Sequence, residues 1–410
     1  MTCLGENYPK LNAFVQSSRN NEFVVVGAAR GGWYAIQVLR QLGLHPRCIS
    51  DMRPHENGQL LEIPIFTHEE TFKKRQKTQV VMALLEPDAA KSAAESITDE
   101  YDFVEAMFLM DEILHFFMIE IVGRPVDKRK YWDSIAKYEA KEKDCVSISP
   151  SVSYVMTEKC SLNCQNCGAF VPDIDDPETF DFNSIVSDIK KYCSAFDVVH
   201  HIALQGGEPF MHKNIDKVVK EIAKIPNLLF IDIVTNGTIN PKDVTMFEIK
   251  KNGAAIVMSD YGEHSPKKSS LMSNCERHNV FLDYHVYTDR LWGAQFPIGK
   301  RNRSPRENIR TFTECVADKY LCCQIMNGQL HRCSFSNFTN RLKYIPDFKT
   351  DYVDMNTVPK DKLGSEIRRV ALRKAPLSAC DYCPGLDRDL VEAGVQIPKR
   401  KKQRTTLKSD

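Results

Sequence analysis

Two stretches of the chain alternate short apolar runs with longer amphipathic segments. The first begins at Phe23 with the run Phe-Val-Val-Val, followed by a glycine-rich turn and a helical segment through Leu42. Further apolar runs over 47–50, 80–85 and 103–107 are predicted to be strands, with a helix between the last two. This order predicts an α/β unit with a mainly parallel sheet.

The second stretch starts at Ser151 and repeats the alternation at greater length. Strands are predicted over 152–156, 198–204, 228–234, 254–258 and 280–287, and helices around 182–192, over 214–224 and from Pro241. Polar motifs follow the first four strands directly: a cysteine loop, Gly206-Gly207-Glu208-Pro209, Thr235-Asn236-Gly237 and Ser259-Asp260-Tyr261. In a parallel β/α barrel this end of the strands is the active-site face, so we expect the motifs to form one site.

The patterns divide the chain into six predicted segments. They are a disordered tail over 1–20, a Rossmann-like domain over 21–107, a helical connector over 108–148, a β/α barrel over 149–300, a small cysteine-rich domain over 301–395 and a basic tail over 396–410. The longest apolar stretch is interrupted by acidic residues, so it is not expected to span a bilayer.

Composition narrows the range of functions. The chain has 410 residues, of which 42% are hydrophobic and 27% charged, and its net charge is +1. This balance gives no electrostatic case for a nucleic-acid or membrane partner. Fourteen cysteines without an apolar leader indicate a reducing cytoplasm and bound metal. We therefore expect a soluble, cytoplasmic, metal-binding protein.

The cysteine loop contains the pattern C-x3-C-x2-C, formed by Cys160, Cys164 and Cys167. Three thiolates on one loop can ligate three irons of a cubane cluster and leave the fourth iron open to a small molecule. A zinc knuckle or structural cysteines are the alternatives. Zinc sites usually present paired C-x2-C units, which argues against zinc without excluding it.

The triplet is followed, one strand–helix–strand unit later, by the turn Gly206-Gly207-Glu208-Pro209. Together the two motifs resemble the radical S-adenosylmethionine (SAM) superfamily of enzymes, which implies a partial (β/α)6 barrel. The resemblance implies that the three cysteines hold a [4Fe-4S] cluster whose open iron binds SAM, and that the turn binds the SAM amino group through the carboxylate of Glu208. It further implies that Asn236, with Ser259 or Asp260, contacts the ribose and carboxylate of SAM.

A second group of cysteines lies near the end of the chain, and four of them could ligate one centre. They are Cys315, Cys333, Cys380 and Cys383. Asn327-Gly328 predicts a hairpin turn that would bring the first two together. The spacing resembles the twitch domain, a shortened SPASM domain, which implies an auxiliary [4Fe-4S] cluster. A closed zinc site is the alternative.

Cys322 and Cys323 are not needed by this four-ligand pattern. One of them could be a hydrogen-atom donor, or both could be small buried core residues. Five basic residues lie between 300 and 310, and they form either a solvated loop or a phosphate site.

The first glycine turn contains Gly27, Gly31 and Gly32, and Asp51 follows the next strand. This is the order of a dinucleotide-binding fold, although Ala29 replaces the second glycine of the motif. The domain binds either a nucleotide or nothing. It resembles the Rossmann-like domains fused to sugar-modifying enzymes of bacterial surface-polysaccharide pathways, which implies a nucleotide or nucleotide-sugar ligand.

The resemblances together imply a radical SAM oxidoreductase or isomerase. Its substrate would be a sugar or nucleotide-sugar, oxidised or epimerised after loss of a hydrogen atom, and its electrons would come from a flavodoxin or ferredoxin. A peptide or a cofactor precursor is an alternative substrate. One alternative of another class is a non-catalytic iron–sulfur electron carrier or scaffold, but such a protein has no need of the Gly-Gly-Glu-Pro turn. Another alternative is a zinc-bearing nucleic-acid-modifying protein.

Overall fold

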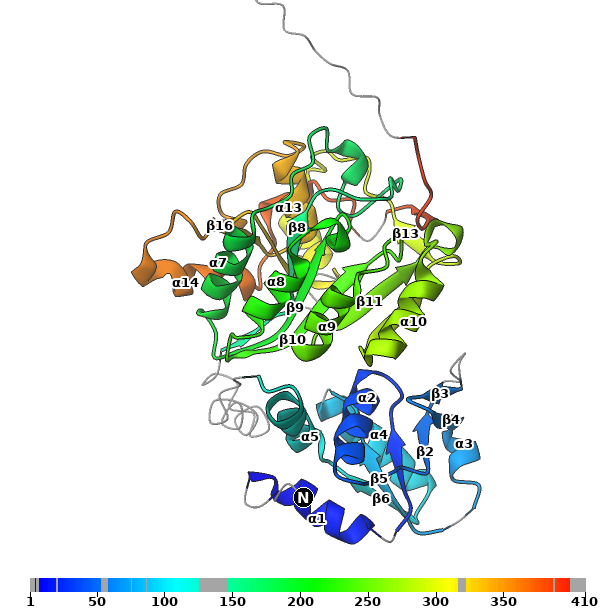
Figure 1. Cartoon of the computed structure of the whole chain (residues 1–410). Helices are drawn as coiled ribbons and strands as arrows, with labels where there is room; N and C mark the ends of the chain where they lie inside the picture. The colour runs from blue at the N-terminus through cyan, green and yellow to red at the C-terminus, as the bar shows by residue number, and fades with distance from the viewer. Residues whose placement is uncertain are drawn as a thin grey trace, which may run out of the picture. The chain divides into compact units, whose positions relative to one another are not determined.

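The computed structural model describes residues 4, 7–19, 21–52, 58–74, 76–85, 87–124, 147–315, 322–385 and 388–398. The chain divides into two compact units, Met1–Arg124 and Pro125–Asp410, drawn in blue to cyan and in green to red in Figure 1. Among the described residues, no helix combines the length and apolar character needed to span a bilayer.

The first unit is built on a six-stranded sheet in the order β3-β4-β2-β1-β5-β6. The strands are β1 (Phe23–Val26), β2 (Cys48–Asp51), β3 (Gln59–Leu60), β4 (Ile63–Thr67), β5 (Thr78–Met82) and β6 (Val104–Met107). All neighbours are parallel except the β3–β4 hairpin. With β3 set aside, the strands follow the chain order 3-2-1-4-5 of a doubly wound fold, so the predicted parallel sheet is confirmed.

Helices α2 (Arg30–Gln41), α3 (His68–Thr71) and α4 (Pro87–Glu100) connect these strands. The core between helices and sheet is apolar. Strand β1, for example, has the sequence Phe-Val-Val-Val and is buried along its whole length. A short cap fixes the start of α3, since the hydroxyl of Thr67 accepts a hydrogen bond from the amide of Glu70 and the Glu70 carboxylate accepts one from the amide of Thr67.

The ends of the first unit correct two predictions. Residues 9–18 form helix α1 (Pro9–Ser18) instead of a disordered tail, because Leu11 and Phe14 are fully buried and Glu112 accepts hydrogen bonds from the amides at the start of the helix. Helix α5 (Met110–Phe116) and the π-helical turn Phe117–Ile121 also pack within this unit. The predicted connector therefore does not begin at 108, and its residues 125–146 lie outside the described ones.

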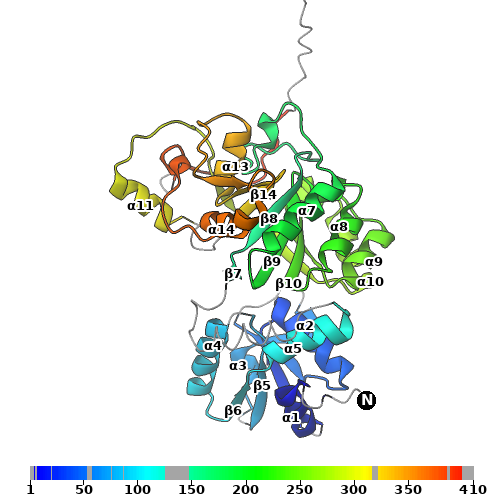
Figure 2. The same ribbon diagram turned by 90° about the vertical axis from the view of Figure 1, so that its left-hand side faces the viewer.

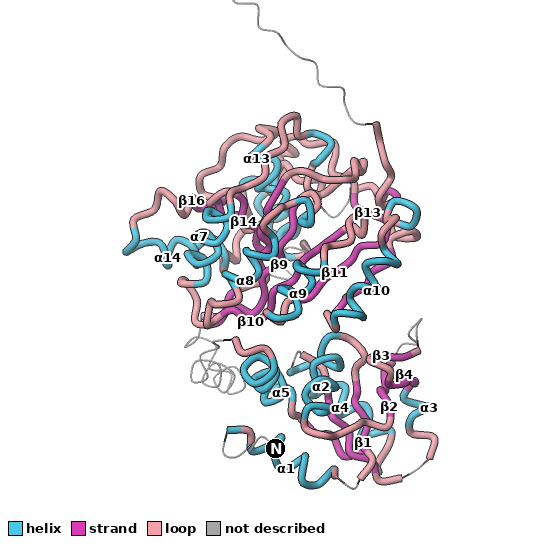
Figure 3. The backbone as a smooth tube through the Cα atoms, viewed as in Figure 1, coloured by secondary structure: helices cyan, strands magenta, loops and turns pink. Residues whose placement is uncertain are grey.

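The second unit is organised around a larger sheet, whose strands are drawn as arrows in Figure 2 and in magenta in Figure 3. Its parallel strands β8 (Val152–Thr157), β9 (Val198–Gly206), β10 (Leu228–Thr235), β11 (Ala255–Asp260) and β12 (Leu282–Val286) lie in the order β12-β11-β10-β9-β8. β7 (Ile148–Ser149) adds a short pairing to β9. Each strand falls within a few residues of its predicted position, and the predicted barrel-like parallel sheet is confirmed.

Four helices cover one face of this sheet: α7 (Phe182–Cys193), α8 (Ile215–Ile222), α9 (Asp243–Lys251) and α10 (Lys268–His278). The first three lie at or near their predicted positions because their apolar residues recur at helical spacing and are buried against the strands. Helix α10 was not among the predicted helices. The Asp181 carboxylate caps α7 by accepting hydrogen bonds from the amides of Asn183 and Ser184.

The cysteine-rich region extends the same sheet. β14 (Cys323–Met326) is parallel to β8, and the antiparallel strands β15 (Gln329–His331) and β16 (Tyr352–Asp354) follow. Asn327 and Gly328 have φ angles of +48° and +78°, which confirms the predicted two-residue hairpin turn.

The helices of this region are α11 (Pro305–Thr313), α13 (Ser334–Arg341), α14 (Lys360–Ala371) and the 3-10 turn η7 (Ser378–Asp381). A separate two-stranded sheet pairs β13 (Leu291–Gly293) with β17 (Leu390–Glu392). The predicted basic tail does not begin at 396, because Gln396 and Ile397 form hydrogen bonds with the cysteine loop, and residues 399–410 lie outside the described ones.

Candidate active site

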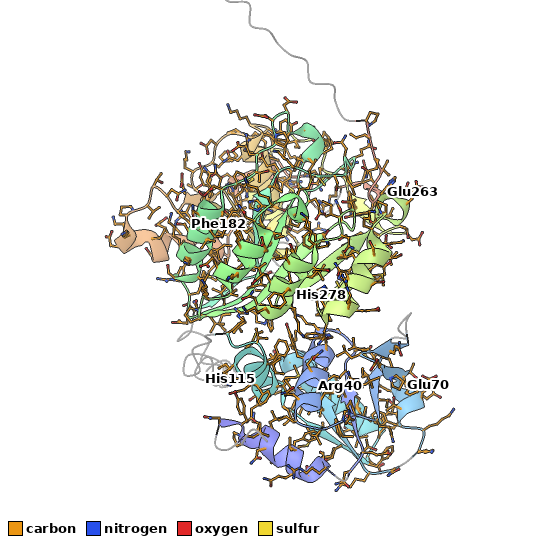
Figure 4. The ribbon with its side chains drawn as sticks, in the orientation of Figure 1. Arg40, Glu70, His115, Phe182, Glu263 and His278 are labelled. Atoms are coloured by element: carbon orange, nitrogen blue, oxygen red, sulfur yellow. The ribbon has the colours of Figure 1, made fainter. Side chains whose placement is uncertain are left out.

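The predicted motifs lie at the carboxyl edge of the parallel strands. Two labelled residues in Figure 4 mark the two ends of the parallel strands: Glu263 lies just beyond the carboxyl end of β11, and His278 lies at the end of α10 on the opposite side. The motifs lie at the same end as Glu263. The pairing of Thr157 with Gly206 places the start of the cysteine loop beside the Gly-Gly-Glu-Pro turn. The structure therefore brings together the two motifs that the sequence placed about 50 residues apart.

The two loops meet backbone to backbone. The amide of Gly207 donates to the carbonyl of Thr157 at 2.8 Å, and the amide of Glu208 donates to the carbonyl of Lys159 at 2.8 Å. A Cβ atom on Gly206 would lie 2.2 Å from the Thr157 carbonyl oxygen, and one on Gly207 would lie 2.3 Å from that of Lys159. Only glycine permits this approach, so both glycines are needed to hold the cysteine loop in place.

The Glu208 side chain is fully buried and ties the turn to the end of β10. One carboxylate oxygen accepts from the amide of Phe210 at 3.1 Å and from the hydroxyl of Thr235 at 2.8 Å, and the other accepts from the amide of Asn236 at 2.9 Å. Burial raises the pKa of Glu208 to about 7, against the lowering effect of these bonds. An ionised carboxylate has about four acceptor positions, so one remains for the predicted SAM amino group.

Asn236 lies between this carboxylate and the cysteine loop. Its side-chain amide donates toward the Cys160 sulfur at 3.5 Å and to the Ser161 hydroxyl at 3.2 Å. Its side-chain oxygen accepts from both the amide and the hydroxyl of Thr238. The side chain predicted to contact the SAM ribose thus contacts a cysteine sulfur in this structure, a role that the sequence did not indicate.

Asp260 is also buried and fully engaged. Its carboxylate accepts from the amide of Gly262 at 2.8 Å, from the Lys268 ammonium at 3.0 Å and from the Tyr284 hydroxyl. Burial by itself would raise the pKa of Asp260, but the hydrogen bonds from Tyr284, Lys268 and Gly262 hold it below its ordinary value. Asp260 therefore fixes the loop after β11, and of the predicted pair Ser259 is the more exposed.

The three thiols of the cysteine loop lie close enough to influence one another. Burial raises the pKa of Cys160 to about 12 and that of Cys164 to about 11, and the neighbouring thiols add to both shifts. In the described part of the chain, no three His, Cys, Asp or Glu side chains converge as ligands of a single ion. Amide donors nevertheless point at two of the sulfurs, Cys160 and Cys164, and this suits thiolate ligands of a cluster.

The second cysteine set also comes together. Cys383, Cys380 and Cys315 all lie near enough to Cys333 to raise the pKa of its thiol, although burial is the largest cause. Cys333 follows β15 at the start of α13, Cys380 lies in η7, and Cys315 follows α11. These four thiols, all within the described residues, are partly exposed and lie near one another, although they do not converge as ligands of a single ion. Four thiols are the donor set of an iron–sulfur cluster or of a zinc site.

Two residues outside the motif hold the Cys380–Cys383 loop. The Arg303 guanidinium donates to the carbonyl oxygens of Cys380 at 2.7 Å and Cys383 at 3.0 Å. The buried Asp351 carboxylate accepts from the amides of Ser378 at 2.9 Å and Ala379 at 2.8 Å. Arg303 therefore binds the backbone of its own chain, so the phosphate alternative is wrong for this residue.

Comparison with known proteins agrees with this geometry. Residues 154–259 match the family model described as the radical SAM superfamily. The matched segment is about a quarter of the chain. It contains the cysteine triplet, the Gly-Gly-Glu-Pro turn and Asn236, and it ends at Ser259.

Sequence relatives match only a short part of the chain. A GTP 3′,8-cyclase of Stenotrophomonas maltophilia (strain K279a) is 30% identical over 95 residues, which is 23% of this chain and 28% of that protein. Molybdenum cofactor biosynthesis protein 1 of Dictyostelium discoideum is 35% identical over 86 residues, 20% of this chain and 13% of that protein. The match thus spans less than a third of either curated relative.

Among solved structures, BtrN in complex with AdoMet and 2-DOIA is similar with a TM-score of 0.39 and 13% identity, over 61% of this chain and 97% of that one. A likeness at this level carries no argument about the substrate or about the second cysteine set.

The structure also places the two cysteines that the four-ligand pattern does not need. Cys323 is 2% exposed in the hydrophobic core, where its thiol donates to the carbonyl of Ala371. The register pairs it with Val152 at the start of β8, about 16 Å along the strand from Thr157 at the carboxyl edge. Cys323 is therefore buried in the core, as one of the two alternatives predicted. Cys322 is exposed, and its predicted role stays a prediction.

The glycine turn of the first unit is explained by packing. A Cβ atom on Gly31 would lie 2.0 Å from the Ala83 carbonyl oxygen, and one on Gly32 would lie 2.0 Å from that of Gly27. The Asp51 carboxylate accepts from the amide of Ala28 at 2.8 Å. Gly27 has a φ of +104°, which favours glycine. These contacts account for every residue of the predicted motif, and binding of a nucleotide there stays a prediction.

Proposed function

We propose that this protein is a radical SAM enzyme that removes a hydrogen atom from a sugar or nucleotide-sugar and leads it to oxidation or epimerisation. The observation that carries the proposal is the joining of the cysteine loop to the Gly-Gly-Glu-Pro turn through the Gly207–Thr157 and Glu208–Lys159 hydrogen bonds. An electron carrier has no need of a turn that brings exposed backbone beside its cluster, so this pairing favours an enzyme.

Cys160, Cys164 and Cys167 would hold the cluster, and the backbone of Gly206 and Gly207 would let SAM approach it closely. When bound, the cluster and SAM supply a 5′-deoxyadenosyl radical, which takes a hydrogen atom from carbon. The chain's own part is to exclude water and fix the loops. Glu208 and Asn236 do this by joining three strand ends through buried hydrogen bonds.

The auxiliary set Cys315, Cys333, Cys380 and Cys383 would hold a second [4Fe-4S] cluster. Support comes from the proximity of the four thiols, because burial raises the pKa of Cys333 and the other three thiols add to that rise. A second redox centre favours net oxidation of the substrate, because the enzyme then has an acceptor for an electron. A flavodoxin or ferredoxin would supply the electron for SAM cleavage in a reducing cytoplasm.

The doubly wound first unit is the basis for proposing a sugar or nucleotide-sugar substrate. The strand order reverses between β1 and β5, and in doubly wound folds ligands bind beside the strand ends at such a point. A nucleotide or cofactor precursor is the second candidate substrate, because the matched relatives are named for GTP cyclisation and for molybdenum cofactor biosynthesis. Each match covers less than a quarter of this chain, so it favours the chemistry more than the substrate.

The test is SAM cleavage by the anaerobically reconstituted protein with a strong reductant. We expect 5′-deoxyadenosine from the wild-type chain and none from a Cys160→Ala variant, with Cys193→Ala as a control that removes a buried cysteine outside both sets. Iron binding without 5′-deoxyadenosine would contradict the proposal and favour the electron-carrier alternative.

Substrate class is tested by supplying deuterated sugars, nucleotide-sugars, GTP and peptides in turn. Transfer of deuterium into 5′-deoxyadenosine identifies the substrate, and solvent deuterium gained at carbon separates epimerisation from oxidation. Transfer from GTP or a peptide alone would contradict the proposed sugar substrate.

A further inference from the structure

The segment 388–397, here called the strap, returns from the second cysteine set to the first. Its strand β17 pairs with β13, and the following residues run antiparallel to the cysteine loop. The amide of Gln165 donates to the carbonyl of Val395 at 2.7 Å, and the amide of Ile397 donates to the carbonyl of Asn163 at 3.0 Å. These bonds hold the middle of the cysteine loop from outside the barrel sequence.

Gln396 is the strap residue that reaches a cysteine. Its side-chain nitrogen donates to the Cys164 sulfur at 3.0 Å and to the Gly394 carbonyl at 2.6 Å. Its side-chain oxygen accepts from the amide of Asn163 at 2.8 Å. The backbone amide needs an acceptor and the Gly394 carbonyl needs a donor, so the orientation that points nitrogen at sulfur is fixed.

The strap is also packed against the end of β11. Gly394 has a φ of +74°, and a Cβ atom there would lie 2.6 Å from the Tyr261 ring. Tyr261 in turn lies close enough to Cys164 and Cys167 for these thiols to raise its pKa, although burial is the larger cause. The strap thus lies against both the cysteine loop and the Ser259-Asp260-Tyr261 turn.

We infer that the strap is a positioning element for the first cluster and that Gln396 raises the reduction potential of that cluster through its hydrogen bond to Cys164. The inference rests on the proposed cluster at Cys160, Cys164 and Cys167. A donor to a ligating sulfur stabilises negative charge, and the reduced cluster carries one more negative charge than the oxidised one. The bond therefore stabilises the reduced cluster more than the oxidised cluster.

The first test is an EPR-monitored redox titration of the intact holoenzyme, following the signal that changes when SAM is added. Gln396→Glu keeps the size of the side chain and removes its N–H donors, and Gln396→Leu removes all polarity. We expect both variants to shift the reduction equilibrium about tenfold toward the oxidised cluster, ~59 mV for a one-electron couple. Gln41→Leu, on the exposed end of α2, is the matched control and should shift nothing.

The second test needs no cluster. Backbone hydrogen exchange of the cluster-free full chain is compared with chains ending at 398 and at 387. We expect the peptide containing Gln165 to exchange at least tenfold faster only in the chain ending at 387, because only that chain lacks the Val395 acceptor.

The outcomes separate this inference from the proposed function. An unchanged midpoint potential in both Gln396 variants, or unchanged exchange in the chain ending at 387, overturns the inference while leaving the cluster in place. A wild-type chain that assembles no cluster overturns the proposed function, and with it the effect on the potential.

Discussion

The first cysteine site takes its three thiols from one short loop, whereas the second takes four thiols from three segments that are distant in sequence. The hydrogen bonds around the cysteines of the two sites also differ. At the first site, Asn236 and Gln396 donate to the sulfur atoms themselves. At the second, the side chains of Arg303 and Asp351 bind the backbone around the cysteines, and the Cys383 sulfur accepts from the backbone amide of Gly385 at 3.4 Å. The first site is therefore formed by one loop whose sulfur atoms accept side-chain hydrogen bonds. The second site forms only when three distant segments pack together.

The largest effect is expected from Asp351→Ala, because this removes the acceptor for two amides that precede Cys380. Leaving those amides unsatisfied should lower the free energy of unfolding by about 2–4 kcal/mol. Iron per chain should fall by about half, because only the second cluster should be lost. Within the described residues, the cysteine loop of the first site does not contact Asp351. Asp347→Ala, whose side chain is 49% exposed, is the control. Full iron content and unchanged denaturant unfolding in the Asp351 variant would contradict the claim that the second site depends on this packing.

The next effect concerns the buried carboxyl at the first site. Burial raises the pKa of Glu208 from 4.5 to about 7, so the folded chain binds this proton more tightly than the unfolded chain. The resulting contribution to the free energy of unfolding is fully present below about pH 4.5 and is lost as pH rises through 7. Glu208→Gln does not titrate. The free energy of unfolding of the variant, minus that of the cluster-free wild type, should therefore rise by about 2–3 kcal/mol between pH 5 and 8.

Urea unfolding at the two pH values measures this difference directly. A constant offset between variant and wild type at both pH values would show that Glu208 is not buried as a titrating group, and its role in joining the two loops would then need revision.

A smaller effect is expected from Arg303→Ala, which removes the guanidinium bonds to the Cys380–Cys383 loop. We expect a loss of about 1–2 kcal/mol in the free energy of unfolding and faster release of iron from the second site only. Arg306→Ala, on the exposed start of α11, should match the wild type. Equal iron release from both sites on exposure to a chelator would show that the two sites are not independently held.

The smallest effect is expected from Cys323→Ala. Removing a buried sulfur should cost about 1 kcal/mol of stability and leave SAM cleavage unchanged, because this residue lies in the core. Loss of substrate turnover with normal SAM cleavage would instead restore it as a hydrogen-atom donor.

Much of this fold could be predicted from the chain because its periodicities are strong. The strands of both sheets are apolar runs, and each polar motif follows one of them directly, so the site at the carboxyl edge was predictable. Helix α1 was missed although Leu11, Phe14 and Val15 recur at helical spacing, because a short polar terminus is usually loose.

The supporting residues of the site could not be predicted in the same way. Gln396 lies 232 residues from Cys164, and nothing in the sequence near either residue indicates the contact. Arg303 lies in a basic run for which a solvated loop or a phosphate site was predicted, and only the fold shows that it binds carbonyl oxygens. Long-range hydrogen bonds of this kind depend on tertiary packing, to which local patterns give no access.

The most direct measurement counts iron and zinc per chain in the anaerobically reconstituted wild type and in two variants. One variant replaces Cys160, Cys164 and Cys167 by Ala, and the other replaces Cys315 and Cys333. We predict about eight irons in the wild type and about four in each variant, with SAM cleavage retained only in the second. About four irons together with bound zinc in the wild type, or loss of all iron from either variant, would contradict two independently assembled clusters.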